Sequence, residues 1–198
     1  MTNDSTTSMS EINFVKIRRE ERKKDEKWIK SFLQNAPYGT IATAVSNQPF
    51  LVTRNFVYDD EKNAIYFHGA PSGRTIDNIR KNPRVCFSTT QMGRLLPANK
   101  ACEFGVEYAG VVAFGQAHLV EDPQEARRGL QMLLDKYFPK LKPVRDYQPI
   151  AGEAIRTTAV IRIDINSWSG KMRKEGKEIP GAFAYPEQTD PDRSVDRG

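Results

Sequence analysis

Three short segments with the composition of strands, separated by brief turns, constrain the fold of this chain most. Residues 40–45 alternate between apolar and polar side chains, and residues 50–58 and 64–68 are rich in β-branched and aromatic residues. The connections over 47–49 and 59–63 are too short for a crossover, so neighbouring segments are expected to pair with each other. This arrangement predicts an antiparallel meander.

Three later segments continue the β pattern, and three helices are predicted around it. The expected strands cover 84–89, 106–120 and 157–166, and the expected helices cover 18–35, 74–81 and 123–137. Residues 91–105 lack periodicity and are expected to form a long loop that shapes a pocket. Because no strand–helix–strand repeat indicates a parallel sheet, the chain is predicted to be mainly β with flanking helices, as a closed or nearly closed six-stranded antiparallel barrel.

Polar ends flank the region that carries this pattern. A single domain is predicted over residues 16–174 of the 198-residue chain. Residues 1–15 are expected to be a disordered arm, and residues 175–198 a polar tail that is mobile or straps a neighbour.

The composition argues against several classes of protein. No apolar run approaches the roughly 18 residues that a membrane span needs, and the first ten residues lack the apolar stretch of a secretory signal. A cytoplasmic protein without a membrane partner is therefore expected. Cys86 and Cys102 lie far apart and form no CxxC pair, and with only His68 and His118 beside them they do not match an ordinary structural zinc site, so no metal is expected.

The net charge of +5 favours anionic partners. Between Lys16 and Lys30, however, eight basic residues are interleaved with four acidic ones, in pairs such as Glu20–Lys24 and Glu26–Lys30. This segment is typical of a solvated helix face. It lacks the aromatic platforms on which nucleic-acid bases stack, so nucleic-acid binding is the weaker alternative and no such partner is expected.

The stretch from Ile65 to Ile79 leads from a strand through a glycine-containing turn into a helix. Free backbone N–H groups at a helix N-terminus attract anions, and Ser72, Arg74 and Thr75 add two hydroxyls and a guanidinium at the same place. The local pattern thus predicts a phosphate pocket. An ordinary strand–turn–helix with exposed polar residues is the alternative.

A second candidate is the run Thr53, Arg54 and Asn55, three consecutive polar residues inside a predicted strand. A half-buried strand has one polar face, whereas here both faces carry polar groups, and buried polar groups need partners. A flat heteroaromatic ligand would supply such partners. Alternatively, Arg54 pairs with an acid at a barrel end and Asn55 caps a turn.

His68 ends a strand beside the proposed phosphate turn. An imidazole there is suited to proton transfer near neutral pH or to steering a substrate, which makes His68 the candidate catalytic residue. A satisfied structural histidine is the alternative, and it is the interpretation adopted for His118.

Several motifs in order resemble one known family. They are Asn55-Phe-Val-Tyr58, Ile65-Tyr-Phe-His-Gly-Ala70, Gly73-Arg-Thr75, Asn78-Ile-Arg-Lys-Asn-Pro-Arg-Val-Cys-Phe87 and Ser169-Gly-Lys-Met172. Together they resemble the pyridoxamine 5′-phosphate oxidase-like superfamily, and within it the nitroimidazole-resistance branch. The resemblance implies a six-stranded split β-barrel that forms a homodimer and binds flavin mononucleotide (FMN) in the groove between two copies.

The resemblance also implies roles for individual residues. The strand around Arg54 is expected to face the isoalloxazine ring, the segment after His68 to pass the ribityl chain or the ring, and the turn at Gly73 to hold the phosphate. The full set of expected cofactor-binding residues is Thr53, Arg54, Asn55, His68, Gly69, Ala70, Gly73, Arg74, Thr75, Asn78 and Lys171. Many relatives have a lysine where this chain has Thr75. Binding of the phosphate is therefore expected to rely on Arg74 or on a basic residue of the second copy.

The function implied is that of an FMN-dependent oxidoreductase acting on a small molecule, with a nitro-aromatic compound as a candidate substrate. The flavin would supply the redox chemistry, and the protein would position it. A non-catalytic flavin- or haem-binding protein, or a stress protein, is the alternative, because the same fold can bind without turnover.

Overall fold

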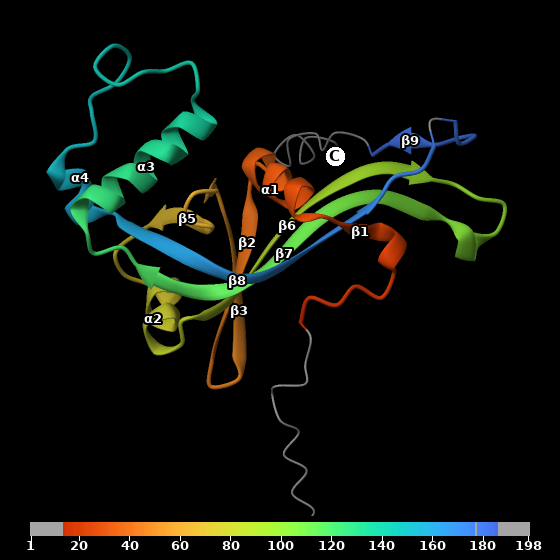
Figure 1. Ribbon diagram of the computed structural model, residues 1–198, viewed down its shortest axis with the longest axis horizontal. Coiled ribbons are helices and arrows are strands. Elements are labelled where there is room, and N and C mark those ends of the chain that lie inside the picture. The colour runs from red at the N-terminus through yellow and green to blue at the C-terminus, as the bar shows by residue number, and fades with distance from the viewer. Residues whose placement is uncertain (1–13, 177, 186–198) are drawn as a thin grey trace, which may run out of the picture.

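The computed structural model describes residues 14–176 and 178–185 (Figure 1). These residues form nine strands in one antiparallel sheet, whose main path runs in the order β3-β2-β6-β7-β8-β5-β4, with β1 paired to β8 and β9 paired to β6. The strands are β1 (Lys23–Lys24), β2 (Gly39–Val45), β3 (Gln48–Arg54), β4 (Val57–Asp59), β5 (Ala64–Gly69), β6 (Arg84–Leu96), β7 (Gly105–Leu119), β8 (Ala159–Arg173) and β9 (Phe183–Ala184). The helices are α1 (Glu26–Asn35), α2 (Arg74–Lys81), α3 (Pro123–Tyr137) and α4 (Gly152–Thr157), with 3-10 turns at Glu20–Arg22 and Ala101–Glu103.

The mainly β class with flanking helices is confirmed, and neighbouring segments pair antiparallel as expected, but the described residues form nine strands rather than six and the meander is interrupted between β3 and β4. The single strand predicted over 50–58 is two strands, β3 and β4, which bend apart at Asn55 and Phe56. β3 pairs with β2, whereas β4 pairs with β5, so these two consecutive strands lie at opposite ends of the main path. At this break the Phe56 side chain is fully buried in the interior. The sheet is therefore split at this corner.

Two further sequence predictions are corrected near the ends of the sheet. The helix predicted over 18–35 begins only at Glu26, where the Asp25 carboxylate accepts a hydrogen bond from the Trp28 N–H (2.8 Å) and fixes the helix start. The loop predicted over 91–105 is a strand as far as Leu96, because β6 and β7 continue to pair beyond the body of the sheet. The long hairpin they form extends to the right in Figure 1.

The helices α2 and α3 match their predicted bounds because both carry local start and stop signals. Asp122 caps α3 by accepting from the N–H groups of Gln124 and Glu125, and α2 ends just before Pro83. The predicted Glu26–Lys30 pair forms at 3.1 Å, while Glu20 pairs with Lys23 (3.8 Å).

The remaining sequence predictions concern the two chain ends, the cysteines and membrane-spanning segments. The arm predicted over 1–15 and the tail predicted over 175–198 lie largely outside the described residues. Cys86 and Cys102 are free thiols. Within 14–176 and 178–185, no helix is long and apolar enough to cross a membrane.

Both faces of β5 are buried, and this places the helices on two sides of the sheet. Ile65 and Phe67 belong to the larger core, together with residues of α1 and α2. Ala64 and Tyr66 point the other way, into a smaller core against α3. Figure 1 shows α3 on one side of β5 and β8, and α2 on the other. Residues that follow Phe67 therefore alternate between two different environments.

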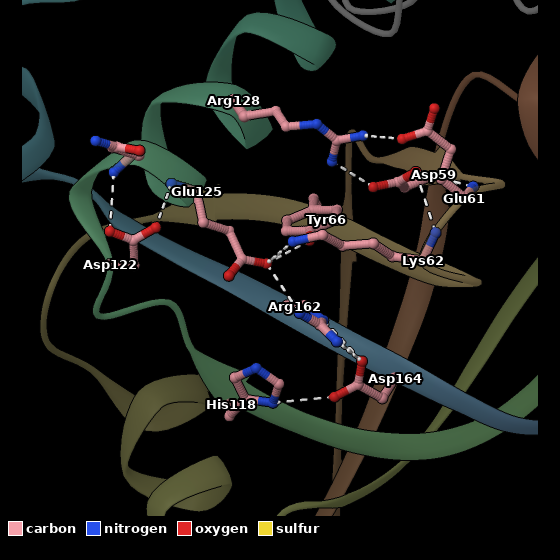
Figure 2. Close-up of polar contacts among 11 residues, drawn as sticks. Asp59, Glu61, Lys62, Tyr66, His118, Asp122, Glu125, Arg128, Arg162 and Asp164 are labelled. Carbon is pink, nitrogen blue, oxygen red and sulfur yellow. Dashed lines mark hydrogen bonds and ion pairs between the residues drawn. The ribbon is translucent and has the colours of Figure 1, made fainter.

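A network of charges fastens α3 to the sheet (Figure 2). The Glu125 carboxylate accepts hydrogen bonds from the Tyr66 hydroxyl (2.5 Å), Lys62 Nζ (3.0 Å) and Arg162 Nη1 (2.9 Å). One turn further along α3, Arg128 pairs with the buried Asp59. The hydrogen bond from Tyr66 and those from the two cations lower the pKa of Glu125 from 4.5 to about 2, despite the opposing effect of burial.

We predict that the Glu125→Gln variant loses stability less steeply in acid than the parent protein. The folded state lowers the pKa of Glu125, so its carboxylate contributes stability that is complete above pH 4.5 and is lost as the pH falls toward 2. Urea unfolding across this range measures the difference. The control variant Glu121→Gln changes an exposed residue outside the network and should keep the parent slope; equal slopes in all three proteins would contradict the prediction.

Candidate functional site

The corner between β3 and β4 is held by the last turn of α3. The Phe56 N–H donates to the Tyr137 hydroxyl (3.0 Å), which in turn donates to the Pro37 carbonyl (2.6 Å). Lys136 Nζ donates to the Phe56 carbonyl (2.9 Å) and lies 4.0 Å from the centre of the Phe56 ring. Burial lowers the pKa of Lys136 to about 8. Both backbone groups of Phe56 thus bind to side chains of one helix.

This corner separates neighbouring residues into two pockets. Arg54 lines one pocket, and Asn55 lines another. The same division occurs at the end of β5, where Gly69 lines the pocket of Arg54 and His68 lines that of Asn55. The two pockets therefore back onto each other across single stretches of backbone.

The first pocket, here called the anion pocket, has a volume of about 220 Å³. The start of α2 opens onto it through Gly73, Arg74 and Thr75. Gly73 has a φ of 123°, which favours glycine, and no side chain caps the helix. First-turn N–H groups that lack a capping partner are a favourable place for an anion. The other lining residues are Phe50, Val52, Arg54, Phe67, Gly69, Ala70, Ser72, Ile76 and Ile161.

Two guanidinium groups reach the anion pocket from different elements. Arg54 comes from β3, and its guanidinium packs 3.6 Å from the point that a Cβ on Gly69 would occupy. The Nε of Arg54 is buried and has no hydrogen-bond partner among the described residues. Arg74, from α2, lies 5.1 Å from the centre of the Phe50 ring. Two guanidinium-bearing residues and a helix start thus line one pocket.

The second pocket, here called the apolar pocket, has a volume of about 430 Å³ and lies between α3, α4 and the two strand ends. His68 and Asn55 contribute polar groups, and α3 contributes Leu130, Leu133 and Leu134 to the wall. Partial desolvation of the imidazole, and secondarily the charge of Arg54, lower the pKa of His68 below its usual value of 6.5. At neutral pH the imidazole is therefore uncharged, with one donor and one acceptor nitrogen.

The family model described as pyridoxamine 5′-phosphate oxidase matches residues 25–172. The chain belongs to the pyridoxamine 5′-phosphate oxidase family. The match spans β2 to β8 and both pockets. No curated protein matches the chain.

Solved structures share the fold over most of the chain. A flavocytochrome from Azotobacter vinelandii is 20% identical, with a TM-score of 0.72 over 91% of this chain and 87% of its own. An FAD and heme binding protein from Mycobacterium smegmatis is 18% identical, with a TM-score of 0.68 over 88% and 80%. A candidate 5-nitroimidazole antibiotic resistance protein from Bacteroides thetaiotaomicron is 21% identical, with a TM-score of 0.62 over 75% and 84%. These likenesses confirm the predicted split-barrel class.

The structure brings together only part of the residue set predicted from the resemblance to the pyridoxamine 5′-phosphate oxidase family. Arg54, Gly69, Ala70, Gly73, Arg74 and Thr75 line the anion pocket, whereas Asn55 and His68 line the apolar pocket.

Three other predicted residues lie outside both pockets. The Thr53 hydroxyl bonds to that of Thr40 (3.0 Å), and Asn78 Nδ2 donates to the Thr43 hydroxyl (2.8 Å), which ties α2 to β2. Lys171 lies ten residues along β8 from Ile161, or about 33 Å at the rise of an extended strand. It lies over the Tyr108 ring instead (5.6 Å).

The apolar pocket was missed in the sequence, although one signal for it exists. Leu130, Leu133 and Leu134 form an apolar stripe that Phe138 extends beyond the end of α3. Such a stripe is expected to fill a core, and here part of it lines an open space instead. The opposite wall comes from α4, which carries no sequence signal strong enough to predict it.

We predict that Tyr137→Phe lowers the free energy of unfolding by about 1–3 kcal/mol, because the buried Phe56 N–H loses its acceptor. Urea denaturation at neutral pH measures the change. The matched control is Tyr147→Phe, which removes a hydroxyl that accepts from Gln131 (2.9 Å) in a surface connection and should cost less than about 0.5 kcal/mol. Similar losses in both variants would show that the corner does not depend on Tyr137.

Proposed function

We propose that this protein binds FMN with the phosphate in the anion pocket, and that it is an oxidoreductase acting on a small molecule. The observation that carries the proposal is that two arginines, Arg54 and Arg74, line the same pocket as the uncapped start of α2. Membership of the pyridoxamine 5′-phosphate oxidase family supports it. So do neighbours of the same fold that are described as flavocytochrome and FAD-binding proteins.

The residues present fit a phosphate monoester. A doubly charged phosphate has several acceptor oxygens, and guanidinium groups and helix-terminal N–H groups are its usual protein partners. Thr75, which replaces the lysine expected from the resemblance, is buried at 8% exposure. In this proposal Arg54, arriving from β3, supplies the positive charge that such a lysine would bring.

We extend the proposal to a homodimer. The anion pocket, at about 220 Å³, is smaller than the roughly 300–1,000 Å³ of typical small-molecule sites, so one copy would hold only part of the cofactor. Leu51, on the edge strand β3 beside this pocket, is 63% exposed and is available for contact with a second copy. Lys171 is too distant to serve the pocket of its own chain, and in a dimer it would serve that of its partner.

The division of tasks in the proposed enzyme follows from the two pockets. When bound, FMN supplies hydride or single-electron transfer. Arg54 and Arg74 hold its phosphate, and the uncharged His68 offers a nitrogen that exchanges a proton with a small molecule in the apolar pocket. Reduction of a nitro-aromatic compound is the proposed activity, which the fold of the nitroimidazole-resistance neighbour supports.

We predict that Arg74→Ala weakens FMN binding by about 1.5–3 kcal/mol, the scale of a charge-assisted hydrogen bond. Riboflavin lacks the phosphate, so its affinity should be the same for the variant and the parent protein. Fluorescence titration of both flavins measures the two effects. The control His68→Ala, which changes the other pocket, should retain FMN. Unchanged FMN affinity in Arg74→Ala would remove the start of α2 from the cofactor site.

Assays of flavin reduction separate the proposed enzyme from a carrier. Steady reduction of the bound flavin by NADH or NADPH, followed by its reoxidation on adding a nitro-aromatic compound, would support the oxidoreductase. Failure of every donor would favour a flavin carrier. A sharp Soret band after adding haemin, with no binding of FMN, would favour a haem-binding protein.

A further inference from the structure

The apolar pocket is lined entirely by uncharged side chains. Its walls come from the C-terminal half of α3, from α4 and the residue two before it, and from the strand ends beneath them. The lining residues are Asn55, His68, Leu130, Leu133, Leu134, Tyr137, Phe138, Ile150, Ala154 and Thr158. None of these ten is a lysine, arginine, aspartate or glutamate, although 28% of the whole chain is charged. A charge in this pocket would have no partner of opposite sign in its lining.

The size of this pocket suits a small molecule. Its volume of about 430 Å³ lies within the roughly 300–1,000 Å³ of ligand sites, which are typically apolar with a few convergent polar groups. A void lined by leucines is costly in an ordinary interior, because the lining side chains lose their packing partners. Leu133 and Leu130 of the α3 stripe also pack in the smaller core, and the surface that they and Leu134 turn to this cavity is left for an occupant.

The helix α4 and the connection that leads into it form the roof of the pocket, and polar contacts fix this roof to α3. Arg127 donates to the Ile150 carbonyl, and Gln131 Nε2 donates to the Tyr147 hydroxyl (2.9 Å), so the connection from α3 to α4 is fastened twice. Ile155 of α4 packs against the smaller core. The space between α3 and α4 is thus a formed cavity with a defined roof.

The floor of the pocket is polar at one end only. The side chains of Asn55 and His68 are exposed and make no hydrogen bond to any residue in the described part of the chain. An amide and a neutral imidazole together offer both donors and acceptors. A ligand seated here would meet apolar contacts along most of its surface and hydrogen-bonding groups at one edge.

We propose that the apolar pocket binds an uncharged, mainly apolar ring compound with one hydrogen-bonding edge, and that this is the substrate class of the protein. The assignment as substrate rests on the proposed flavin function, because the anion pocket lies on the other side of Arg54–Asn55 and of His68–Gly69. The binding site itself stands without it. A phosphorylated substrate is expected to bind this pocket poorly, because none of its lining residues is a lysine or arginine that could pair with the phosphate.

A matched pair of fluorescent probes tests the ligand class. N-phenyl-1-naphthylamine is uncharged, and 8-anilino-1-naphthalenesulfonate has the same rings with a sulfonate added. Both are titrated into the full chain, with and without FMN. The pocket should bind the uncharged probe at least 10-fold more tightly than the sulfonate.

A pocket-filling substitution locates the binding. Ala154 is an exposed lining residue on α4, so Ala154→Trp should occupy the cavity without disturbing the core, and should weaken binding of the uncharged probe at least 10-fold. The control Ala151→Trp adds the same side chain to an exposed position just before α4 that does not line the pocket, and should leave the affinity unchanged. Circular dichroism spectra of both variants should match that of the parent protein.

The outcomes distinguish this inference from the proposed cofactor site. Unchanged affinity for the uncharged probe in Ala154→Trp would overturn the ligand site. Equal binding of the sulfonate, also blocked by Ala154→Trp, would overturn the uncharged class. If the parent protein failed to bind FMN while the uncharged probe still bound and Ala154→Trp still blocked it, the flavin proposal would fail and the ligand site would be supported.

Discussion

The buried corner at Phe56 is the constraint on which the rest of this structure depends. The Phe56 N–H donates a hydrogen bond to the Tyr137 hydroxyl, and the Phe56 carbonyl accepts one from Lys136, both at the end of α3. Without these partners, two buried backbone groups would be unsatisfied, and the chain would favour the continuous strand that its composition suggests. Because the corner forms, β3 and β4 take opposite ends of the main path, and the barrel is split there.

The corner also determines the chemistry on each side of it. Arg54 lines a small pocket with a helix start and a second guanidinium, whereas the next residue, Asn55, lines a larger pocket without charge. The two sides are linked electrostatically, since the charge of Arg54 adds to burial in lowering the pKa of His68. In the proposed function, this back-to-back arrangement would place a charged cofactor and a neutral molecule next to each other.

What the sequence could predict follows from the range of the interactions involved. The anion pocket was largely predictable, because Gly73, Arg74 and Thr75 lie in one turn and their geometry is local. The helices α2 and α3 were predictable for the same reason. The break in the segment 50–58 was not, since it depends on contacts with residues about 80 positions away. The apolar pocket was likewise hidden, because its lining is drawn from segments as far apart as Asn55 and Thr158.

A crystal structure of the protein soaked with FMN tests the central claim most directly. The account predicts phosphate oxygens within hydrogen-bonding distance of the N–H groups that begin α2 and of the guanidinium of Arg54. A phosphate bound elsewhere, with the start of α2 solvated and Arg54 still unpartnered, would contradict it. The split barrel would then remain, but its assignment as a flavoprotein would be withdrawn.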